Sequence, residues 1–309
     1  MKKIVGFALL FAFVVSLNTE TFAQKFTKRK RYMSVGFHIG AANYVGDLDP
    51  GQSAFSPSLK KSGISIGLFA GLIRLTPRLS VRGGLTYNLI RGNDWDVSTG
   101  GEDDRFRRVR NLSFINNIVE LKVDAVYDIF ANKGTYLKRP DYVPFVFLGL
   151  AAFYHDPMAK DPETDKLTRL RPLKTEGISY LPVSVSIPFG IGVRKKMNKM
   201  WDVSFEIGWR WTFTDYLDDV SGTYIGSTDP NVRKFETRSN TKEVFDYATE
   251  SGLGQNYVAD KNVPGGQFLN GFGEAGDKRG DSKYNDWYII SAVQFTKILK
   301  GGVRCPKFR

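Results

Sequence analysis

Residues 202–214, DVSFEIGWRWTFT, alternate between polar and apolar side chains. The apolar set is Val203, Phe205, Ile207, Trp209, Trp211 and Phe213. The polar set is Asp202, Ser204, Glu206, Gly208, Arg210 and Thr212. A period of two indicates a β-strand with one apolar face. A soluble sandwich would turn the charged face toward water, whereas a narrow membrane barrel would turn it toward the lumen, where ion pairs can form.

The same alternation recurs along the chain. It is clear at 79–90, 115–129 and 183–194, and further strands are expected near 33–46, 63–74, 142–155 and 284–297. These segments reach the roughly 9–11 residues that cross a membrane in a tilted barrel. The connections alternate between long and short, and the long ones are 47–62, 92–110, 156–182 and 219–282. Membrane barrels place long loops at one end and short turns at the other, whereas sandwiches have no reason to do so.

The sequence therefore predicts an all-β protein, an antiparallel transmembrane β-barrel of about eight strands with long extracellular loops, short periplasmic turns and both termini in the periplasm. At the start of the chain, Lys2 and Lys3 precede the apolar run IVGFALLFAFVV, and Ala23 suits a signal peptidase. We expect residues 1–23 to be a cleaved signal peptide, with an uncleaved membrane anchor as the alternative. Residues 24–309 then form one outer-membrane barrel domain, with a long extracellular loop at about 219–282 and a periplasmic tail at about 298–309.

The inward faces of the predicted strands carry charges of both signs. In an eight-stranded barrel the lumen is only wide enough to be filled by side chains, so we expect an ion-pair network there and no conduction. Its expected members are Arg82, Glu120, Lys122, Asp124, Arg194, Glu206 and Arg210. His38, in the middle of a strand with a glycine-rich face, is expected to fill the same lumen.

Three carboxylates follow the strand at 202–214 within the stretch TFTDYLDDVSGTY. Asp215, Asp218 and Asp219 could ligate calcium, but the alternating oxygen ligands, central glycine and terminal glutamate of an EF-type loop are missing. A pair between His155 and Asp215 could support acid–base chemistry. The favoured interpretation is a solvated, hydrogen-bonded loop junction, and no catalytic residue, metal site or cofactor is predicted.

Positive charge gathers in the predicted periplasmic segments 25–33, 74–78, 130–141, 194–202 and 296–309. They hold 19 Lys or Arg against two acids, Asp141 and Asp202, which accounts for the whole excess of +12 in the chain. Such a rim favours an acidic protein surface or anionic lipid headgroups, and charge alone does not choose between them. Neither nucleic acid nor a small-molecule substrate is expected. The expected docking residues are Lys138, Arg139, Lys195, Lys196, Lys199, Lys300, Arg304 and Lys307.

Cys305 is the single cysteine and follows the last predicted strand, so it would lie in the oxidising periplasm. With no partner in its own chain, it is either a free thiol or half of an intermolecular disulfide. The basic stretch GGVRCPKFR around it would favour the reactive thiolate, which prompts the disulfide hypothesis.

Several stretches resemble the PorG-type outer-membrane proteins of the type IX secretion system. They include VELKVDAVYDIF, YVPFVFLGLAAFYHDP, SIPFGIGVRKKM, FEIGWRWTFTDYLDDVSGTY and the closing CPKF. The most specific is the motif Thr214, Asp215, Tyr216, Leu217, Asp218 and Asp219, and the resemblance weakens in the loop 225–282. It implies a small, non-enzymatic barrel in protein secretion and the associated gliding motility, which works with a periplasmic ring of a lipoprotein and its partner. It assigns no role to the three aspartates.

Two other functions stay open at this point. One is an outer-membrane enzyme that uses Asp215, Asp218 or Asp219 with His155. The other is a small pore or solute receptor, which single-channel conductance would reveal. The resemblance favours the structural and docking role over both.

Overall fold

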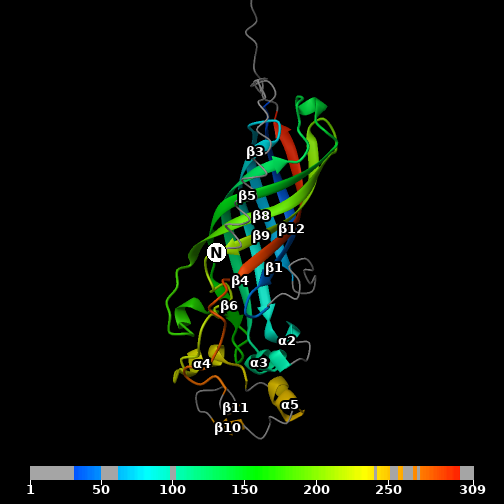
Figure 1. The fold of residues 1–309 in the computed structure, drawn as a ribbon. Helices are drawn as coiled ribbons and strands as arrows, with labels where there is room; N and C mark the ends of the chain where they lie inside the picture. The colour runs from blue at the N-terminus through cyan, green and yellow to red at the C-terminus, as the bar shows by residue number, and fades with distance from the viewer. Residues whose placement is uncertain are drawn as a thin grey trace, which may run out of the picture.

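A computed structural model describes residues 31–49, 62–97, 102–239, 242–250, 257–259, 267–269 and 272–299. Within these ranges eight long antiparallel strands close into a barrel, because β1 pairs with β12 and β3 with β4 (Figure 1). Their bounds are β1 Met33–Val45, β2 Gly63–Arg74, β3 Leu79–Asn93, β4 Ser113–Asp128, β5 Tyr142–Tyr154, β8 Val183–Lys196, β9 Trp201–Thr212 and β12 Trp287–Leu299. The predicted eight-stranded antiparallel barrel is therefore confirmed.

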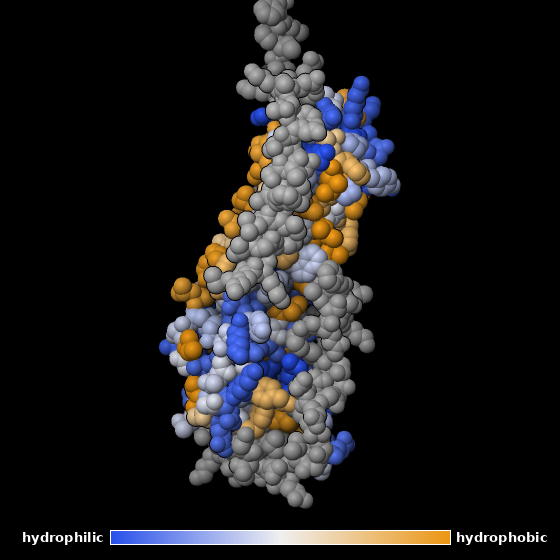
Figure 2. Space-filling view, in the orientation of Figure 1, coloured by the Kyte–Doolittle hydropathy of each residue, from blue (hydrophilic) through white to orange (hydrophobic). Residues whose placement is uncertain are grey.

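The apolar faces of the strands point out of the barrel. Leu68, Leu121 and Leu150 are 67%, 63% and 71% exposed, and Figure 2 shows a hydrophobic wall between hydrophilic ends. Water would penalise so large an apolar surface, whereas a bilayer stabilises it, and every strand finds a neighbour on both sides, so that no open edge faces the hydrocarbon. The fold is that of a transmembrane β-barrel.

The predicted lumen residues lie together inside this wall. Arg82 contacts Asp124 at 2.8 Å and Glu206 at 2.9 Å, while Lys122 is 3.4 Å from Asp124. All of them are almost fully buried. The barrel thus places its charges where each can meet an opposite charge, since an unpaired charge in this dry interior would be very unfavourable.

Further layers fill the lumen above and below this cluster. Arg210 lies 3.5 Å from Glu120, which also accepts a hydrogen bond from the Tyr288 hydroxyl. Toward the short turns, Asp128 bridges Arg74 at 2.6 Å and Arg194 at 3.2 Å. His38, as expected, lies in the lumen, with Nε2 3.2 Å from Ser65 Oγ. The rings of Phe145 and Phe147 are buried in the same interior.

Two glycines of β8 make room for these rings. A Cβ on Gly190 would lie 2.7 Å from Phe147 Cζ, and one on Gly192 would lie 2.4 Å from Phe145 Cζ. Both distances are shorter than real contacts, so only glycine lets the rings lie flat against the inner wall. Arg82 and Arg194 in turn lie over Phe147 and Phe145, at 5.2 and 5.0 Å from the ring centroids.

The last strand begins later than its alternation suggests, at Trp287 instead of 284. Asn285 and Asp286 hydrogen-bond back to the segment after β9: Asn285 Nδ2 donates to the Thr212 carbonyl at 3.2 Å, and the Asp286 N–H donates to the Thr214 carbonyl at 3.1 Å. This cross-connection ends the ladder and starts the loop structure.

All remaining elements except the 3₁₀ turn Tyr136–Lys138 cover one end of the barrel, here called the loop end; the turns 75–78, 129–141 and 197–200 form the opposite turn end (Figure 1). A hairpin extends the wall, because Met158 pairs with Ile115 of β4. In the described ranges, no helix is long and apolar enough to cross a membrane. The elements are α2 Asp94–Val97, α3 Glu102–Arg110, β6 Pro157–Lys160, β7 Leu167–Arg169, α4 Pro230–Glu236, α5 Lys242–Glu250, β10 Tyr257–Ala259 and β11 Gln267–Leu269, with single 3₁₀ turns at Tyr136–Lys138 and Arg171–Leu173.

Arg82 offers a test of the lumen network. We expect Arg82→Met to lower the free energy of unfolding by about 3–5 kcal/mol, because it leaves Asp124 and Glu206 buried with less compensation. Urea unfolding in lipid vesicles, followed by tryptophan fluorescence, measures the change. Lys160→Met is the matched control: it removes an exposed ion pair with Asp165 and should cost about 0–1 kcal/mol. Equal shifts for the two variants would contradict a structural role for the network.

Candidate functional site

The motif TDYLDD folds inward over the mouth of the barrel. Leu217 and Val220 are fully buried in the apolar cluster that lies above the charged lumen layers. The Leu217 carbonyl accepts a 2.7 Å hydrogen bond from Asn116 Nδ2 on β4. The segment therefore forms a stopper, held from the inner wall, that separates the lumen from the loop end.

Asp218 and Asp286 hold the stopper through one tyrosine. The Tyr44 hydroxyl lies 2.6 Å from Asp218 Oδ2 and 2.7 Å from Asp286 Oδ1. It has one proton and can donate to one of the two, so both short contacts require a proton on the other carboxyl. Burial raises the pKa of both Asp218 and Asp286 well above the usual range. The same carboxyls accept the Leu217 and Val220 N–H groups at 2.8 and 2.9 Å.

Asp219 anchors the other side of the stopper. It accepts hydrogen bonds from the hydroxyls of Thr175 at 2.5 Å and Tyr180 at 2.6 Å. The Tyr180 ring stacks on Tyr216 at 4.5 Å between centroids and lies parallel to the His155 ring at 6.1 Å. Burial raises the pKa of Asp219 to about 6, against the lowering effect of Arg279.

The expectation of a solvated junction is wrong on one count, because these carboxylates are buried. Asp215, Asp218 and Asp219 are 9%, 1% and 1% exposed, since the chain turns into the barrel mouth after Phe213 instead of continuing outward. Hydrogen bonding, the other half of the expectation, is what holds Asp218 and Asp219 in place. Asp215 lies nearest the surface of the three, and burial raises its pKa to about 7, partly offset by Ser221.

The geometry gives little support to the acid–base and calcium alternatives. His155 is fully buried, its described ring contacts are with Phe153 and Tyr180, and burial lowers its pKa to about 4. Within the described part of the chain, no hydrogen bond joins it to Asp215. Across the described ranges, no three Asp, Glu, His or Cys side chains gather in a way that could hold a metal ion.

Two buried arginines, neither of them expected from the sequence, connect the long loops to one another. Arg110, at the end of α3, binds Asp94 at 2.6 Å and the Asp47 carbonyl at 2.9 Å. Arg279 binds Glu176 at 3.0 Å and the carbonyl of Asp219 at 2.5 Å. Loop charges carry no periodicity, so no pattern distinguished these arginines from solvated ones.

The expected docking residues at the turn end fall into two groups. Lys138, Lys195 and Lys199 are exposed, and Lys196 is partly exposed beside Asp141 at 3.2 Å. Arg139 differs from the expectation: it is 6% exposed, contacts Asp202 at 2.6 Å and donates to several turn carbonyls. Arg139 stabilises the turns and presents no charge to a partner.

Some expectations lie outside the described residues. These are the signal peptide at 1–23 and the tail residues Lys300, Arg304, Cys305 and Lys307. Their roles stay predictions.

The closed antiparallel barrel with its apolar outer wall defines the class of this protein, a transmembrane β-barrel. Residues 10–245 match a family described as Domain of unknown function (DUF6089), and the chain belongs to this family. No curated protein matches the sequence.

Solved structures that are similar include a major outer membrane protein from Thermus thermophilus, with 12% identity, a TM-score of 0.37 and coverage of 86% of this chain and 99% of that one. Neisserial surface protein A has 8% identity, a TM-score of 0.35 and coverage of 87% and 96%. The N-terminal barrel domain of Pseudomonas aeruginosa OprF has 11% identity, a TM-score of 0.33 and coverage of 86% and 98%.

The raised pKa of Asp215 predicts a pH dependence of stability. A carboxyl that binds its proton more tightly when folded stabilises the protein fully below pH 4, and this contribution is lost as the pH rises through about 7. Asp219 also stabilises the protein at low pH, and its contribution is lost as the pH rises through about 6. We expect Asp215→Asn to flatten the fall in unfolding free energy between pH 4 and 7, measured by urea titration. Glu250→Gln, which removes an exposed carboxylate on α5, is the control; an unchanged slope in Asp215→Asn would rule out the assignment.

The contacts of Arg279 predict that the stability of the loops at the loop end can be lowered without unfolding the barrel. Arg279→Met leaves Glu176 without its buried partner, so the loops should open more often while the barrel stays closed. We expect chymotrypsin to cleave the segment after β9 more than about tenfold faster, because 1.4 kcal/mol already corresponds to tenfold. The difference in gel migration between heated and unheated protein, which reports a folded barrel, should not change. Lys278→Met, at the exposed neighbouring position, is the control and should be cleaved at the wild-type rate. If Arg279→Met is also cleaved at the wild-type rate, Arg279 does not hold the loops together.

Proposed function

We propose that this protein is a non-enzymatic outer-membrane component of a type IX protein secretion machine, and that its turn end faces the periplasm and docks a ring-forming lipoprotein and its partner. The resemblance of the TDYLDD region and the other motifs to PorG-type proteins supports this function. The apolar outer wall supports the membrane location, and the short turns at one end support the orientation.

The docking role is supported by the pairing of most acidic side chains of the turn end inside the protein. Asp128 is occupied by Arg74 and Arg194, and Asp202 by Arg139. Among the described acids of this end, Asp141 is the one that stays exposed. The internal carboxylates therefore do not offset the exposed lysines, and the turn end presents a positive surface.

The lysines of this surface differ in what they lie against. Lys195 lies 5.4 Å from the Tyr142 ring centroid and Lys297 5.7 Å from the Trp201 ring centroid, on the outward faces of the strands. These positions suit lipid headgroups at the membrane border. Lys138 and Lys199 lie on the turns between strands, so they are the residues we assign to the protein partner.

The lumen and the stopper support a structural role over the two alternatives. Layers of ion pairs fill the barrel and Leu217 closes its mouth, which argues against a pore. His155, Asp218 and Asp219 are sealed from solvent, which argues against an enzyme that would use them on a substrate. The tail with Lys300, Arg304 and Lys307 would extend the docking surface, and Cys305 would link it covalently to the partner.

Purification from native membranes in mild detergent tests this function. In buffer with reductant, which removes any Cys305 disulfide, we expect a periplasmic lipoprotein ring to co-purify at low salt and to be lost at high salt, because exposed charges are screened. Lys138→Glu with Lys199→Glu should reduce the co-purified ring more than about tenfold. On non-reducing gels, a higher adduct should disappear in Cys305→Ser.

Two controls make the result specific. Lys195→Gln with Lys297→Gln removes the lipid-border charges, and Lys166→Glu changes an exposed charge at the loop end; neither should release the ring. If the Lys138 and Lys199 variant retains as much ring as the wild type at every salt concentration, the docking role fails.

A further inference from the structure

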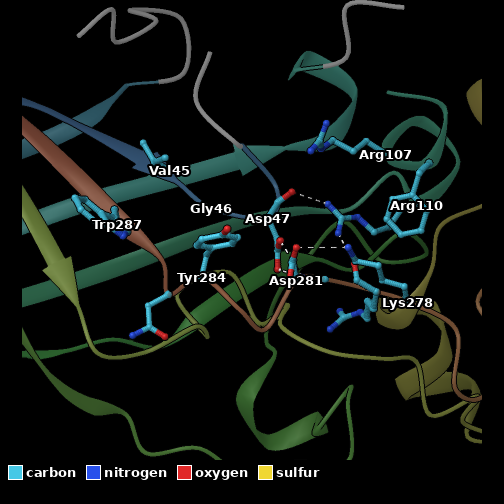
Figure 3. Close-up of a pocket in the computed structure, with 13 residues that line it drawn as sticks. Val45, Gly46, Asp47, Arg107, Arg110, Lys278, Asp281, Tyr284 and Trp287 are labelled. Carbon is cyan, nitrogen blue, oxygen red and sulfur yellow. Dashed lines mark hydrogen bonds and ion pairs between the residues drawn. The ribbon is translucent and has the colours of Figure 1, made fainter. Parts of the chain in front are cut away.

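A pocket of about 690 Å³ lies at the loop end, on the outer side of the barrel wall (Figure 3). Its floor is formed by Val45 and Trp287, register partners at the ends of β1 and β12. Helix α3 supplies one wall through Phe106 and Arg107, and residues 278–285 supply the other. The pocket therefore spans the boundary between the apolar barrel wall and the polar loops.

The height of the pocket in the membrane follows from the rings around it. Trp287 stacks with Trp211 at 5.8 Å, and Trp211 stacks with Phe213 at 5.8 Å. Phe189 lies edge-on to Trp287 at 6.3 Å. Clustered tryptophans on the outward face mark the headgroup level of a membrane barrel. The pocket thus opens where lipid headgroups lie, and its apolar floor continues into the lipid-facing wall.

The side chains around the opening offer three kinds of contact. Arg107 and Lys278 supply positive charge, and Lys278, which is 67% exposed, lies 3.6 Å from the Asp281 carboxylate. Asp281 and Asn285 supply acceptors and an amide that suit sugar hydroxyls. Tyr284 is 75% exposed and Trp287 also lines the pocket, so apolar ring faces adjoin the polar groups. Figure 3 shows Arg107 and Lys278 on different segments of the pocket wall.

The walls are fixed before any ligand binds. Arg110 joins α3 to the Asp47 carbonyl at 2.9 Å and also reaches the Arg279 carbonyl. The Asp281 N–H donates to Asp47 Oδ2 at 3.0 Å. Three separate loops are thereby tied around one cavity, and a preorganised site loses less entropy on binding than a mobile one.

We propose that this pocket binds the phosphorylated sugar headgroup of an outer-leaflet glycolipid. Arg107 and Lys278 contact the phosphate, Asp281 and Asn285 contact sugar hydroxyls, and an acyl chain follows Val45 and Trp287 into the bilayer. Cations alone would accept any anion, and rings alone any apolar group; their combination at headgroup height is what selects a phosphoglycolipid. The inference rests on the proposed orientation, with the loop end outside, and is independent of the docking of a periplasmic ring.

Binding is tested with the full-length protein in lipid nanodiscs. The probes are a bis-phosphorylated acylated diglucosamine and the same glycolipid without phosphates, each measured by quenching of tryptophan fluorescence and by native mass spectrometry. We expect the phosphorylated lipid to bind at least about tenfold more tightly to the wild type than to Arg107→Gln with Lys278→Gln, as the loss of exposed charge-assisted contacts predicts. Lys160→Gln with Lys166→Gln removes the same charge from the β6–β7 hairpin and should bind like the wild type.

The other outcomes overturn the proposal. Equal binding by the two double variants would remove the pocket as the site, and equal binding of the dephosphorylated lipid would remove the phosphate contact. Competition by millimolar inorganic phosphate would show a general anion site. Competition by the deacylated phosphosugar as strong as by the lipid would show a soluble ligand. Unchanged heat-modifiable migration of each variant establishes that the barrel is folded in every arm, so loss of ring docking and loss of lipid binding are separate results.

Discussion

Arg82 and its two carboxylates show the constraint on which the molecule depends: a chain that turns its apolar side chains toward lipid must satisfy every polar one inside. Asp124 and Glu206 approach the same guanidinium from opposite sides of the lumen. Such a buried cluster is weak evidence of net stability, since hydrophobic replacements are often as stable. In this barrel, however, the period of two along each strand leaves the inner positions polar, and complementary charge is the arrangement that lets the strands close around them.

The stopper follows from the same constraint. The mouth of the barrel is where polar lumen, apolar wall and loops meet, and the chain closes it with Leu217 and Val220 while placing carboxylates at the margin of the plug. Those carboxylates accept backbone N–H groups that have no strand partner. A tyrosine from the first strand holds the two ends of the longest loop, because Asp218 lies near its start and Asp286 at its close.

The strands could be predicted from the sequence because lipid and lumen impose opposite preferences on alternate residues, as Phe205 and Glu206 illustrate. The lumen partners could be named for the same reason, since Glu120, Lys122 and Asp124 share one face of one strand. The burial of Asp218 could not be predicted, because its partners Tyr44 and Asp286 are distant in sequence. The local sequence of the TDYLDD motif is also typical of a turn. Arg139 was expected at the surface because its partner Asp202 is also distant in sequence.

The closing strand also determines how the molecule would respond to force. β12 pairs along its whole length with β1, and from Trp287 to Lys297 with β9. A pull on the chain just beyond Leu299, along the strand axis, would load both ladders in shear, so that many hydrogen bonds would have to break together rather than one after another. A load applied at this end of β12 would therefore be shared by both neighbouring strands.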